Sequence, residues 1–398
     1  IPAGLVDGIN YNPNDATKAT LVLDAPLKDF VYVAGSFNNW QPTAAYAMKK
    51  DATAGSTKFW LELTGLTAGT NYAYQYWVVD QTPLAGSPSL VKAADPYSTL
   101  VLSPYDDGGI PATSFPNLPA YPSGQEREVT WFKTGQTPYA WSQATLNFVK
   151  PAKEKLVVYE VLVRDFDARR NFQDLIDKID YFKNLKVNAI QLMPVMEFEG
   201  NESWGYNTSF HMALDKFYGT PEKLKELIDL YHQNGIAVIL DVALNHAFGR
   251  NSMVRMWMND PDGDGFGSPT TENPYFNTVA KHSYSVGEDF NHQQARTKNY
   301  VKRVIKQWVE EFKIDGFRWD LTKGFTQNAQ GSDAQTNAYQ QDRVDVLKEY
   351  ADYSWSLDPT HYVIFEHLGT DAEEKQWADY RINDPISKPS VTDDGTEI

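Results

Sequence analysis

Residues 315–321 read Asp-Gly-Phe-Arg-Trp-Asp-Leu, a short, largely apolar run that carries charged residues at its end. Side chains alternate along a strand, so Arg318 and Asp320 lie on the same side of it. Charged residues at the end of a buried strand are costly unless they are paired or functional. A helix is predicted just before the stretch, because apolar residues recur there with a period of 3.6. These residues are Val301, Val304, Ile305, Trp308 and Phe312.

The same order of short apolar run and amphipathic helix recurs between about residue 156 and residue 366. Strands that alternate with helices predict a parallel sheet covered by helices. The predicted strands are Val157–Val163, Ala189–Val195, Ala237–Val242, Gly316–Leu321 and Tyr362–Glu366. Residues 151–398 are therefore predicted to form an α/β domain of the (β/α)8 TIM-barrel class.

The first part of the chain has a different pattern. In residues 1–104, short alternating runs are separated by clusters of turn-forming residues. This spacing predicts an all-β, immunoglobulin-like sandwich ahead of the α/β domain. Residues 105–150 begin with a stretch rich in proline and glycine and are interpreted as a linker and surface loop.

Composition and charge disfavour several classes of protein. The 398 residues carry 36 Lys and Arg against 52 Asp and Glu, and this net charge of −16 disfavours binding to nucleic acid. No apolar run in the sequence is long enough for a membrane span, and the absence of cysteine excludes disulfides and thiolate metal sites. Aromatic residues make up 14%, which fits either a carbohydrate-binding surface or a large core with β-sandwich aromatics.

Two carboxyl groups at predicted strand ends suggest a reaction. Arg318 is expected to keep Asp320 ionised and to lower its pKa, although these two residues alone also fit a buried ion pair. Glu366 follows an apolar run, so it is expected at the apolar opening of the barrel, where a raised pKa lets it hold a proton. The alternative is an ordinary glutamate at the end of a strand that faces water. One ionised and one protonated carboxyl on neighbouring strands are what a retaining glycosidase needs.

Four motifs resemble those of the α-amylase family of glycoside hydrolases, family thirteen. Asp241-Val-Ala-Leu-Asn-His246 is similar to the first conserved region of that family, Gly316-Phe-Arg-Trp-Asp-Leu321 to the second and Val363-Ile-Phe-Glu366 to the third. Trp204-Gly-Tyr-Asn207 resembles a loop whose tyrosine stacks on the substrate. The residues of the second motif are most similar to those of isoamylases, pullulanases and branching enzymes.

The resemblance implies a role for each matching residue. Asp320 is expected to be the nucleophile and Glu366 the acid/base, while Arg318 orients Asp320. Tyr206 would stack beneath the sugar at the cleavage point, and His246 would donate to one of its hydroxyls. Asp241 is expected to brace Arg318, and Lys323 to line the leaving side. The full set of predicted substrate-binding residues is Trp204, Tyr206, Asp241, His246, Lys323 and His367.

The N-terminal segment agrees with this resemblance. Val31-Tyr-Val-Ala-Gly-Ser-Phe-Asn-Asn-Trp40 is similar to the early-set sandwich modules that precede such barrels. Modules of this kind resemble starch-binding modules, but many have lost sugar binding. We therefore expect packing against the barrel to be the main role of this module, with glycan binding as the alternative.

One loop has the composition of a calcium site. Asp260, Asp262 and Asp264 alternate and are followed by Gly265, as in the first half of a calcium loop. Thr271 stands where the usual twelfth-position glutamate would be, so a plain Asp-Gly turn is the alternative. By the resemblance, Asn245 falls where many family members supply a calcium ligand.

The chain also departs from the family pattern. Many α-amylases carry a histidine at the position of Gly324. The family has a further essential aspartate, which follows a histidine near the seventh strand, but no histidine follows His367 here. Only about five to six βα units are therefore expected in this sequence, with strands six to eight missing and the tail 384–398 neither strand nor helix. A polypeptide with these limits is expected to be inactive by itself.

The sequence leaves three functions open. The first is a retaining hydrolase of α-glucans such as starch, glycogen, pullulan or maltooligosaccharides. The second is an α-glucan transglycosylase of the branching type, and the third is a non-catalytic glycan-binding protein. An α-glucan-degrading enzyme is expected to be secreted, periplasmic or on the cell surface. Linkage preference, endo or exo action and oligomeric state do not follow from the sequence.

Overall fold

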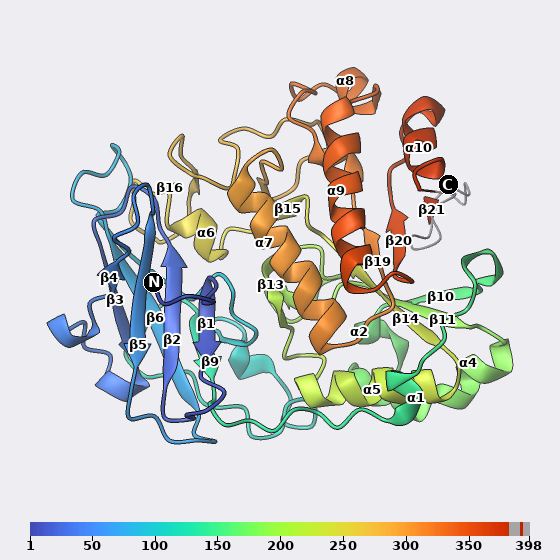
Figure 1. Ribbon diagram of the computed structural model, residues 1–398, viewed down its shortest axis with the longest axis horizontal. Helices are drawn as coiled ribbons and strands as arrows, with labels where there is room; N and C mark the ends of the chain where they lie inside the picture. The colour runs from blue at the N-terminus through green and yellow to red at the C-terminus, as the bar shows by residue number, and fades with distance from the viewer. Residues whose placement is uncertain (382–390, 393–398) are drawn as a thin grey trace. The chain divides into compact units, whose positions relative to one another are not determined.

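The computed structural model describes residues 1–381 and 391–392. The chain divides into two compact units, each made of several segments. Unit 1 contains Ile1–Gly109, Asn117–Pro138 and Gly249–Pro274, and unit 2 contains Ile110–Pro116, Tyr139–Phe248 and Tyr275–Ile398. Figure 1 shows the strands of residues 1–109 of unit 1 in shades of blue and its residues 249–274 in yellow, while most of unit 2 is green to red.

Unit 1 is built mainly from antiparallel strands. One sheet has the order β1 (Gly8–Tyr11), β2 (Ala19–Asp24), β5 (Lys58–Leu63) and β4 (Lys49–Lys50). The other has the order β3 (Phe30–Gly35), β6 (Tyr72–Val79), β9 (Val129–Phe132) and β8 (Val101–Leu102), and β7 (Leu90–Ala93) also pairs with β6. Tyr74 and Tyr76 lie two residues apart on β6, so both point inward, where both donate to the buried carboxylate of Asp95. The all-β character predicted for this part of the chain is thus observed.

Unit 1 contains segments predicted to lie outside the β-rich domain 1–104. The segment interpreted as a linker, 105–150, supplies β9, which pairs with β6 and β8. Residues 249–274 also belong to unit 1, although they lie inside the region predicted to be barrel. They contribute α6 (Ser252–Arg255), β16 (Met258–Asn259) and β17 (Ser268–Pro269). Arg255 of this segment donates to Glu128 at 2.9 Å, and both side chains are buried. Contacts this distant in sequence leave no local pattern.

Unit 2 contains a six-stranded parallel sheet. In order, its strands are β10 (Val158–Val161), β11 (Ala189–Leu192), β14 (Ala237–Val242), β19 (Gly316–Trp319), β20 (Tyr362–Phe365) and β21 (Val391–Thr392). The first five fall within the five predicted strands. The expectation that the tail forms no strand is wrong at 391–392, because β21 pairs in parallel with β20 at Ile364 and Phe365. The rest of the tail lies outside the described residues.

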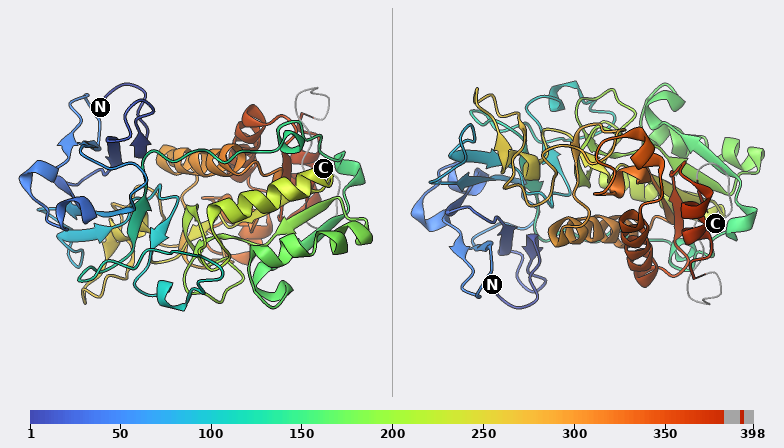
Figure 2. Two further views of the ribbon diagram at one scale, coloured as in Figure 1. Left: turned by 90° about the horizontal axis from the view of Figure 1, so that it is seen from below. Right: turned by 90° about the horizontal axis from the view of Figure 1, so that it is seen from above.

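Helices flank the strands of this sheet (Figures 1 and 2). They are α3 (Phe172–Asp177), α4 (Ile179–Leu185), α5 (Pro221–Gln233), α7 (Ala295–Lys306), α9 (Gln341–Leu357) and α10 (Asp371–Ala378), with the shorter α1 (Gln143–Leu146), α2 (Val163–Phe166) and α8 (Asp333–Asn337). Helix α5 begins where the Thr220 side chain accepts the amide of Lys223 and Pro221 takes the first turn. Gly235, with φ 73°, follows its end. Among the described residues, no helix combines the length and apolar composition needed to cross a bilayer.

Short elements surround one end of the parallel sheet. β12 (Met196–Phe198) pairs with β13 (Thr208–Leu214), and β15 (His246–Ala247) pairs with β18 (Glu288–Asp289). A 3-10 turn, η6 (Thr322–Phe325), follows β19. Helix α7 continues into a π-helical turn, Gln307–Glu311, where the indole of Trp308 is fully buried and donates to the carbonyl of His211 at 2.8 Å. The core of the sheet is apolar, and every residue of β14 is buried.

Candidate active site

Three acidic residues meet at the carboxyl ends of β14, β19 and β20. Asp241 lies opposite Arg318 in the register of β14 and β19, and Arg318 lies opposite Ile364 of β20. The amides of Asp320 and Glu366 extend the ladder, donating to Val242 and Trp319 at 3.0 Å. Because neighbouring parallel strands end together, their last side chains converge.

The guanidinium of Arg318 holds all three carboxylates. Its Nη1 lies 2.9 Å from Oδ1 of Asp320 and 3.0 Å from Oδ2 of Asp241, and its Nη2 lies 3.2 Å from Oε1 of Glu366. The carboxyls of Asp320 and Glu366 are close enough to influence each other's ionisation. The Asp241 side chain is fully buried, whereas those of Asp320 and Glu366 are 17% and 26% exposed, so the second pair is open to a ligand.

Burial raises the pKa of Asp320 to about 7; the neighbouring Glu366 carboxyl adds to the rise, and Arg318 opposes it. The predicted lowering of this pKa is therefore wrong. Arg318 acts in the expected direction, but the loss of water around the carboxylate outweighs it. The raised pKa means that Asp320 holds a proton over much of the range between pH 4 and pH 7.

We expect Asp320→Asn to stabilise the protein above pH 7. The pKa of an unfolded Asp is about 3.9, so between pH 4 and pH 7 the folded state binds more protons at this group than the unfolded state. Its contribution to stability therefore falls as the pH rises through this window and stays low above it. The variant should melt a few degrees above the wild type at pH 8, and the difference should shrink toward pH 4. Equal differences at both pH values would contradict the raised pKa.

A backbone amide that no sequence motif reveals also contacts the acid/base candidate. The N–H of Leu321 donates to Oε2 of Glu366 at 2.8 Å, and Thr322 Oγ1 donates to the Glu366 carbonyl at 2.9 Å. Leu321 has a positive φ of 45°, an unfavourable conformation for a leucine. The turn after Asp320 thus bends sharply and fixes one oxygen of Glu366.

Tyr206 and His246 lie beside the carboxylates, but their polar atoms contact the protein. The Tyr206 hydroxyl donates to Oδ2 of Asp241 at 2.7 Å. Nε2 of His246 lies 2.6 Å from the Tyr206 carbonyl, and its Nδ1 lies 2.9 Å from Oδ1 of Asn245. Burial lowers the pKa of His246 to about 4, so its ring is neutral at pH 7. A sugar hydroxyl would have to replace the Tyr206 carbonyl to reach Nε2.

The other predicted substrate-binding residues differ in exposure. Trp204 is 62% exposed on the loop before Tyr206 and is free to contact a ligand. Nζ of Lys323 donates to Asn337 at 2.9 Å and to the Leu368 carbonyl at 3.1 Å, which holds it at the rim.

His367 does not fit its predicted contact with the sugar. Its side chain is fully buried, with Nδ1 3.0 Å from Thr322 Oγ1 and Nε2 3.4 Å from Glu373. Glu373 in turn accepts two hydrogen bonds from the buried Arg343. His367 therefore belongs to a buried network behind Glu366. The sequence could not show this, because the partners of His367 come from η6 and α10, which no local pattern in the sequence links to it.

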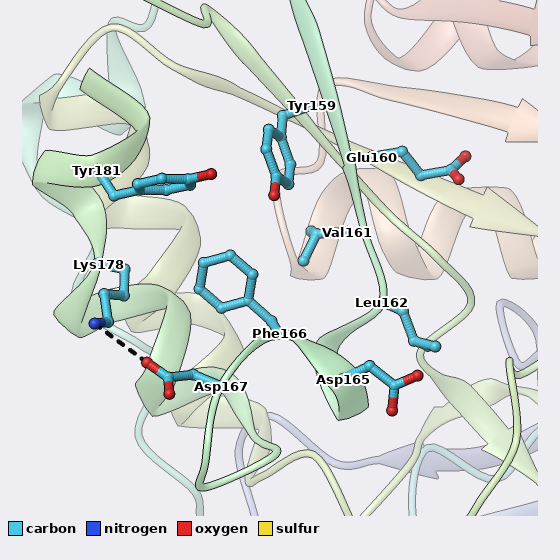
Figure 3. A pocket seen from close by; sticks show the side chains of 9 residues that line it. All are labelled: Tyr159, Glu160, Val161, Leu162, Asp165, Phe166, Asp167, Lys178 and Tyr181. Atoms are coloured by element: carbon cyan, nitrogen blue, oxygen red, sulfur yellow. Dashed lines mark ion pairs between the residues drawn. The ribbon is translucent and has the colours of Figure 1, made fainter. Parts of the chain in front are cut away.

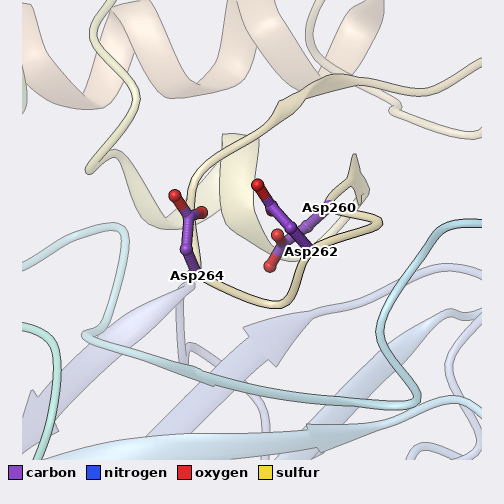
Figure 4. A group of neighbouring side chains, drawn as sticks. All are labelled: Asp260, Asp262 and Asp264. Carbon is purple, nitrogen blue, oxygen red and sulfur yellow. The ribbon is translucent and has the colours of Figure 1, made fainter.

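The three aspartates of the predicted calcium loop lie close together (Figure 4). One oxygen from each of Asp260, Asp262 and Asp264 lies within 4.8 Å of the other two. However, the oxygens of Asp260 already accept the amides of Gly263 and Gly265, each at 3.0 Å. Asn245, the fourth predicted ligand, belongs to the other unit. The arrangement fits the Asp-Gly turn and leaves Asp262 and Asp264 exposed to solvent.

A cavity of about 470 Å³ lies elsewhere in unit 2, along β10, α2 and α4 (Figure 3). Tyr159, Phe166 and Tyr181 form its aromatic wall, and Lys178 pairs with Asp167 at 3.3 Å on one side. No residue of the carboxylate cluster lines it. The cavity is therefore separate from the candidate active site.

Several known proteins are similar to this chain in sequence, and solved structures are similar to it in fold. A malto-oligosyltrehalose trehalohydrolase of Saccharolobus solfataricus is 32% identical over 187 residues, which cover 46% of this chain and 30% of that protein. A 1,4-alpha-glucan-branching enzyme of Aspergillus oryzae is 36% identical over 140 residues, 35% of this chain and 19% of the enzyme. The chain thus spans less than a third of these relatives.

Among solved structures, the Group B Streptococcus pullulanase SAP in complex with maltotetraose has a TM-score of 0.63 at 21% identity. The match covers 91% of this chain and 46% of the pullulanase. It shows a shared fold, in which a parallel-sheet α/β domain accompanies a β-sheet domain.

The family model for the alpha amylase catalytic domain matches residues 165–385, more than half of the chain. This range contains β11, β14, β19 and β20 and every residue of the carboxylate cluster. The chain therefore belongs to the alpha-amylase family.

Proposed function

We propose that the protein containing this chain cleaves α-glucans with retention of configuration at the anomeric carbon. One observation carries this proposal: a single guanidinium, that of Arg318, contacts two partly exposed carboxyls at the ends of neighbouring parallel strands. A retaining glycosidase needs two such groups, one as nucleophile and one as acid/base. The names of the relatives given above point to α-glucan substrates and support the same substrate class.

In the proposed mechanism, Asp320 attacks the anomeric carbon while Glu366 protonates the departing glycosidic oxygen. Glu366 then takes a proton from water, which displaces Asp320 from the glycosyl intermediate. The reaction needs carboxyls about 5–5.5 Å apart, a separation that the ends of neighbouring parallel strands can supply. Arg318 holds Asp320, and the Leu321 amide holds Glu366, in position for these steps.

The pair must carry its proton on Glu366 when the substrate binds. Arg318 lies closer to Asp320, at 2.9 Å, than to Glu366, at 3.2 Å. Burial favours the protonated form of Asp320 in the free site, so substrate binding must shift this pKa down for Asp320 to attack. The roles of Asp320 as nucleophile and Glu366 as proton donor are those that the resemblance implies. Trp204 and Tyr206 would supply aromatic contacts to the sugar.

Transfer to a sugar hydroxyl is the second candidate reaction, because a 1,4-alpha-glucan-branching enzyme is among the relatives that match this chain. Both reactions use the same nucleophile and acid/base, and differ in whether water or a sugar accepts the glycosyl group. A purely glycan-binding role is disfavoured, since a binder has no need for three carboxylates around one arginine.

A product profile on defined maltooligosaccharides and on amylose and pullulan tests the proposal, with Asp320→Asn as the control. Hydrolysis predicts new reducing ends that the control does not release. Transfer predicts longer or branched products with no gain in reducing ends and a change in the iodine staining of amylose. Absence of both activities in the natural full-length protein would leave the glycan-binding role.

Three further expectations stay proposals. The two-sheet architecture of unit 1 supports an early-set, immunoglobulin-like module. The exposed carboxylates of Asp262 and Asp264 support a weak calcium site, which a thermal melt with and without a chelator would test. An α-glucan-degrading role supports export from the cell, which fractionation of the source organism would test.

A further inference from the structure

The turn that follows the nucleophile candidate contains a residue with no room for a side chain. Gly324 lies in η6, four residues after Asp320. A Cβ atom at this position would lie 3.0 Å from Nε2 of His282 and 3.1 Å from Cβ of Asn245. Since 3.0–3.4 Å is tighter than nearly all real Cβ contacts, even alanine would force a neighbour to move. The space beside Gly324 is filled by the ring of His282, which comes from a remote loop.

His282 is held from one side only. Its side chain is almost fully buried, and Nε2 lies 3.1 Å from Oδ1 of Asp289. Oδ2 of Asp289 accepts hydrogen bonds from Asn277 at 2.7 Å and from the amide of Lys281 at 3.0 Å, which fixes the carboxylate. Among the described residues, Nδ1 of His282 has no hydrogen-bond partner. The position of the ring therefore depends on the bond to Asp289 and on packing against Gly324.

This packing joins two parts of the active site. Asp289 of β18 lies opposite His246 of β15, so the loop that holds His282 is paired to the strand that carries His246. Asn245, which borders the same space at Gly324, also lies 2.9 Å from Nδ1 of His246. The turn after Asp320 is thus bordered at Gly324 by both the His282 ring and the Asn245–His246 pair.

We propose that His282 is a positioning residue for the glycosidic reaction. By filling the space at Gly324, it sets η6 against Asn245 and His246, and through η6 it fixes Asp320 and the Leu321 amide that contacts Glu366. This role rests on the proposed function. The competing explanation is that His282 only anchors the loop before β18, in which case its loss would affect stability but not the chemical step.

A double-mutant cycle between His282→Ala and Gly324→Ala tests the packing without any activity measurement. Gly324→Ala should lower the thermal midpoint of the protein in the wild-type background, because its Cβ meets the histidine ring. In the His282→Ala background the same change should have little effect, since the ring is gone. Equal losses in both backgrounds would overturn the assignment of the Gly324 space to His282.

Kinetics on maltooligosaccharides then test the positioning role. We expect His282→Ala to lower kcat by about 10- to 100-fold with little change in KM, because small displacements of reacting groups slow the chemical step. His282→Gln, which keeps a donor for Asp289, should recover part of the loss.

A matched control is His361→Ala. His361 is also a fully buried histidine, but it precedes β20 at the opposite end of the strand from Glu366. This variant should lose thermal stability and keep its kcat at a temperature where it stays folded. If His282→Ala behaves like His361→Ala, the positioning role is refuted and His282 is only an anchor. If the unmodified full-length protein cleaves no α-glucan, the proposed function fails and the positioning role fails with it, whereas the melting cycle still decides what fills the space at Gly324.

Discussion

Asp320→Asn should lower kcat on maltooligosaccharides by about 10⁴-fold or more, because the amide cannot form the glycosyl ester and no other carboxyl lies in its place. The change is nearly isosteric and removes a buried charge, so the variant should stay folded. A melting temperature at pH 8 no lower than that of the wild type would show that the loss is chemical.

A matched control for this substitution is Asp165→Asn. Asp165 also follows a strand of the parallel sheet and pairs with an arginine, Arg164 at 2.7 Å, but it is exposed and outside the carboxylate cluster. Activity of this control should stay within about threefold of the wild type, since exposed ion pairs contribute little. If Asp165→Asn and Asp320→Asn lost activity equally, Asp320 would not be the nucleophile.

Glu366→Gln should lower kcat/KM on maltooligosaccharides by about 10²- to 10⁴-fold, the usual range for loss of a general acid. The loss should be much smaller on a glycosyl donor with an activated leaving group, such as a dinitrophenyl glycoside, in the step that forms the glycosyl intermediate. That leaving group departs without a proton, so only the second step still needs Glu366.

The comparison of the two substrates separates chemistry from misfolding. A burst of released dinitrophenol followed by a slow steady state is the expected signature, because the intermediate forms quickly and is hydrolysed slowly. Equal losses on both substrates, without a burst, would contradict the acid/base role and point to a general defect in binding or folding.

Local patterns in the sequence were sufficient to predict the strands that carry the site. Runs such as 237–242 and 362–365 are short, apolar and flanked by helical periodicity, and both form strands of the parallel sheet. Because chemistry gathers at the carboxyl ends of such strands, the convergence of Asp241, Asp320 and Glu366 followed from strand order alone.

Properties that depend on distant contacts could not be predicted in this way. The effect of Arg318 on Asp320 is visible in the spacing of two residues, but the larger effect of burial depends on how the whole site packs. The same holds for His367, whose contacts with Thr322 and Glu373 replace the expected contact with sugar. The contact between His282 and Gly324 spans 42 residues and carries no motif.

The interleaving of the two units constrains how the protein is made and dissected. Unit 1 needs residues 249–274, which supply β16, β17 and the arginine that neutralises buried Glu128. On the ribosome, this unit cannot reach its final form until more than a hundred residues of unit 2 have been synthesised. A fragment cut after residue 138 would lack that arginine together with β16 and β17, so the β-rich part should not be expressible as an independent module by simple truncation.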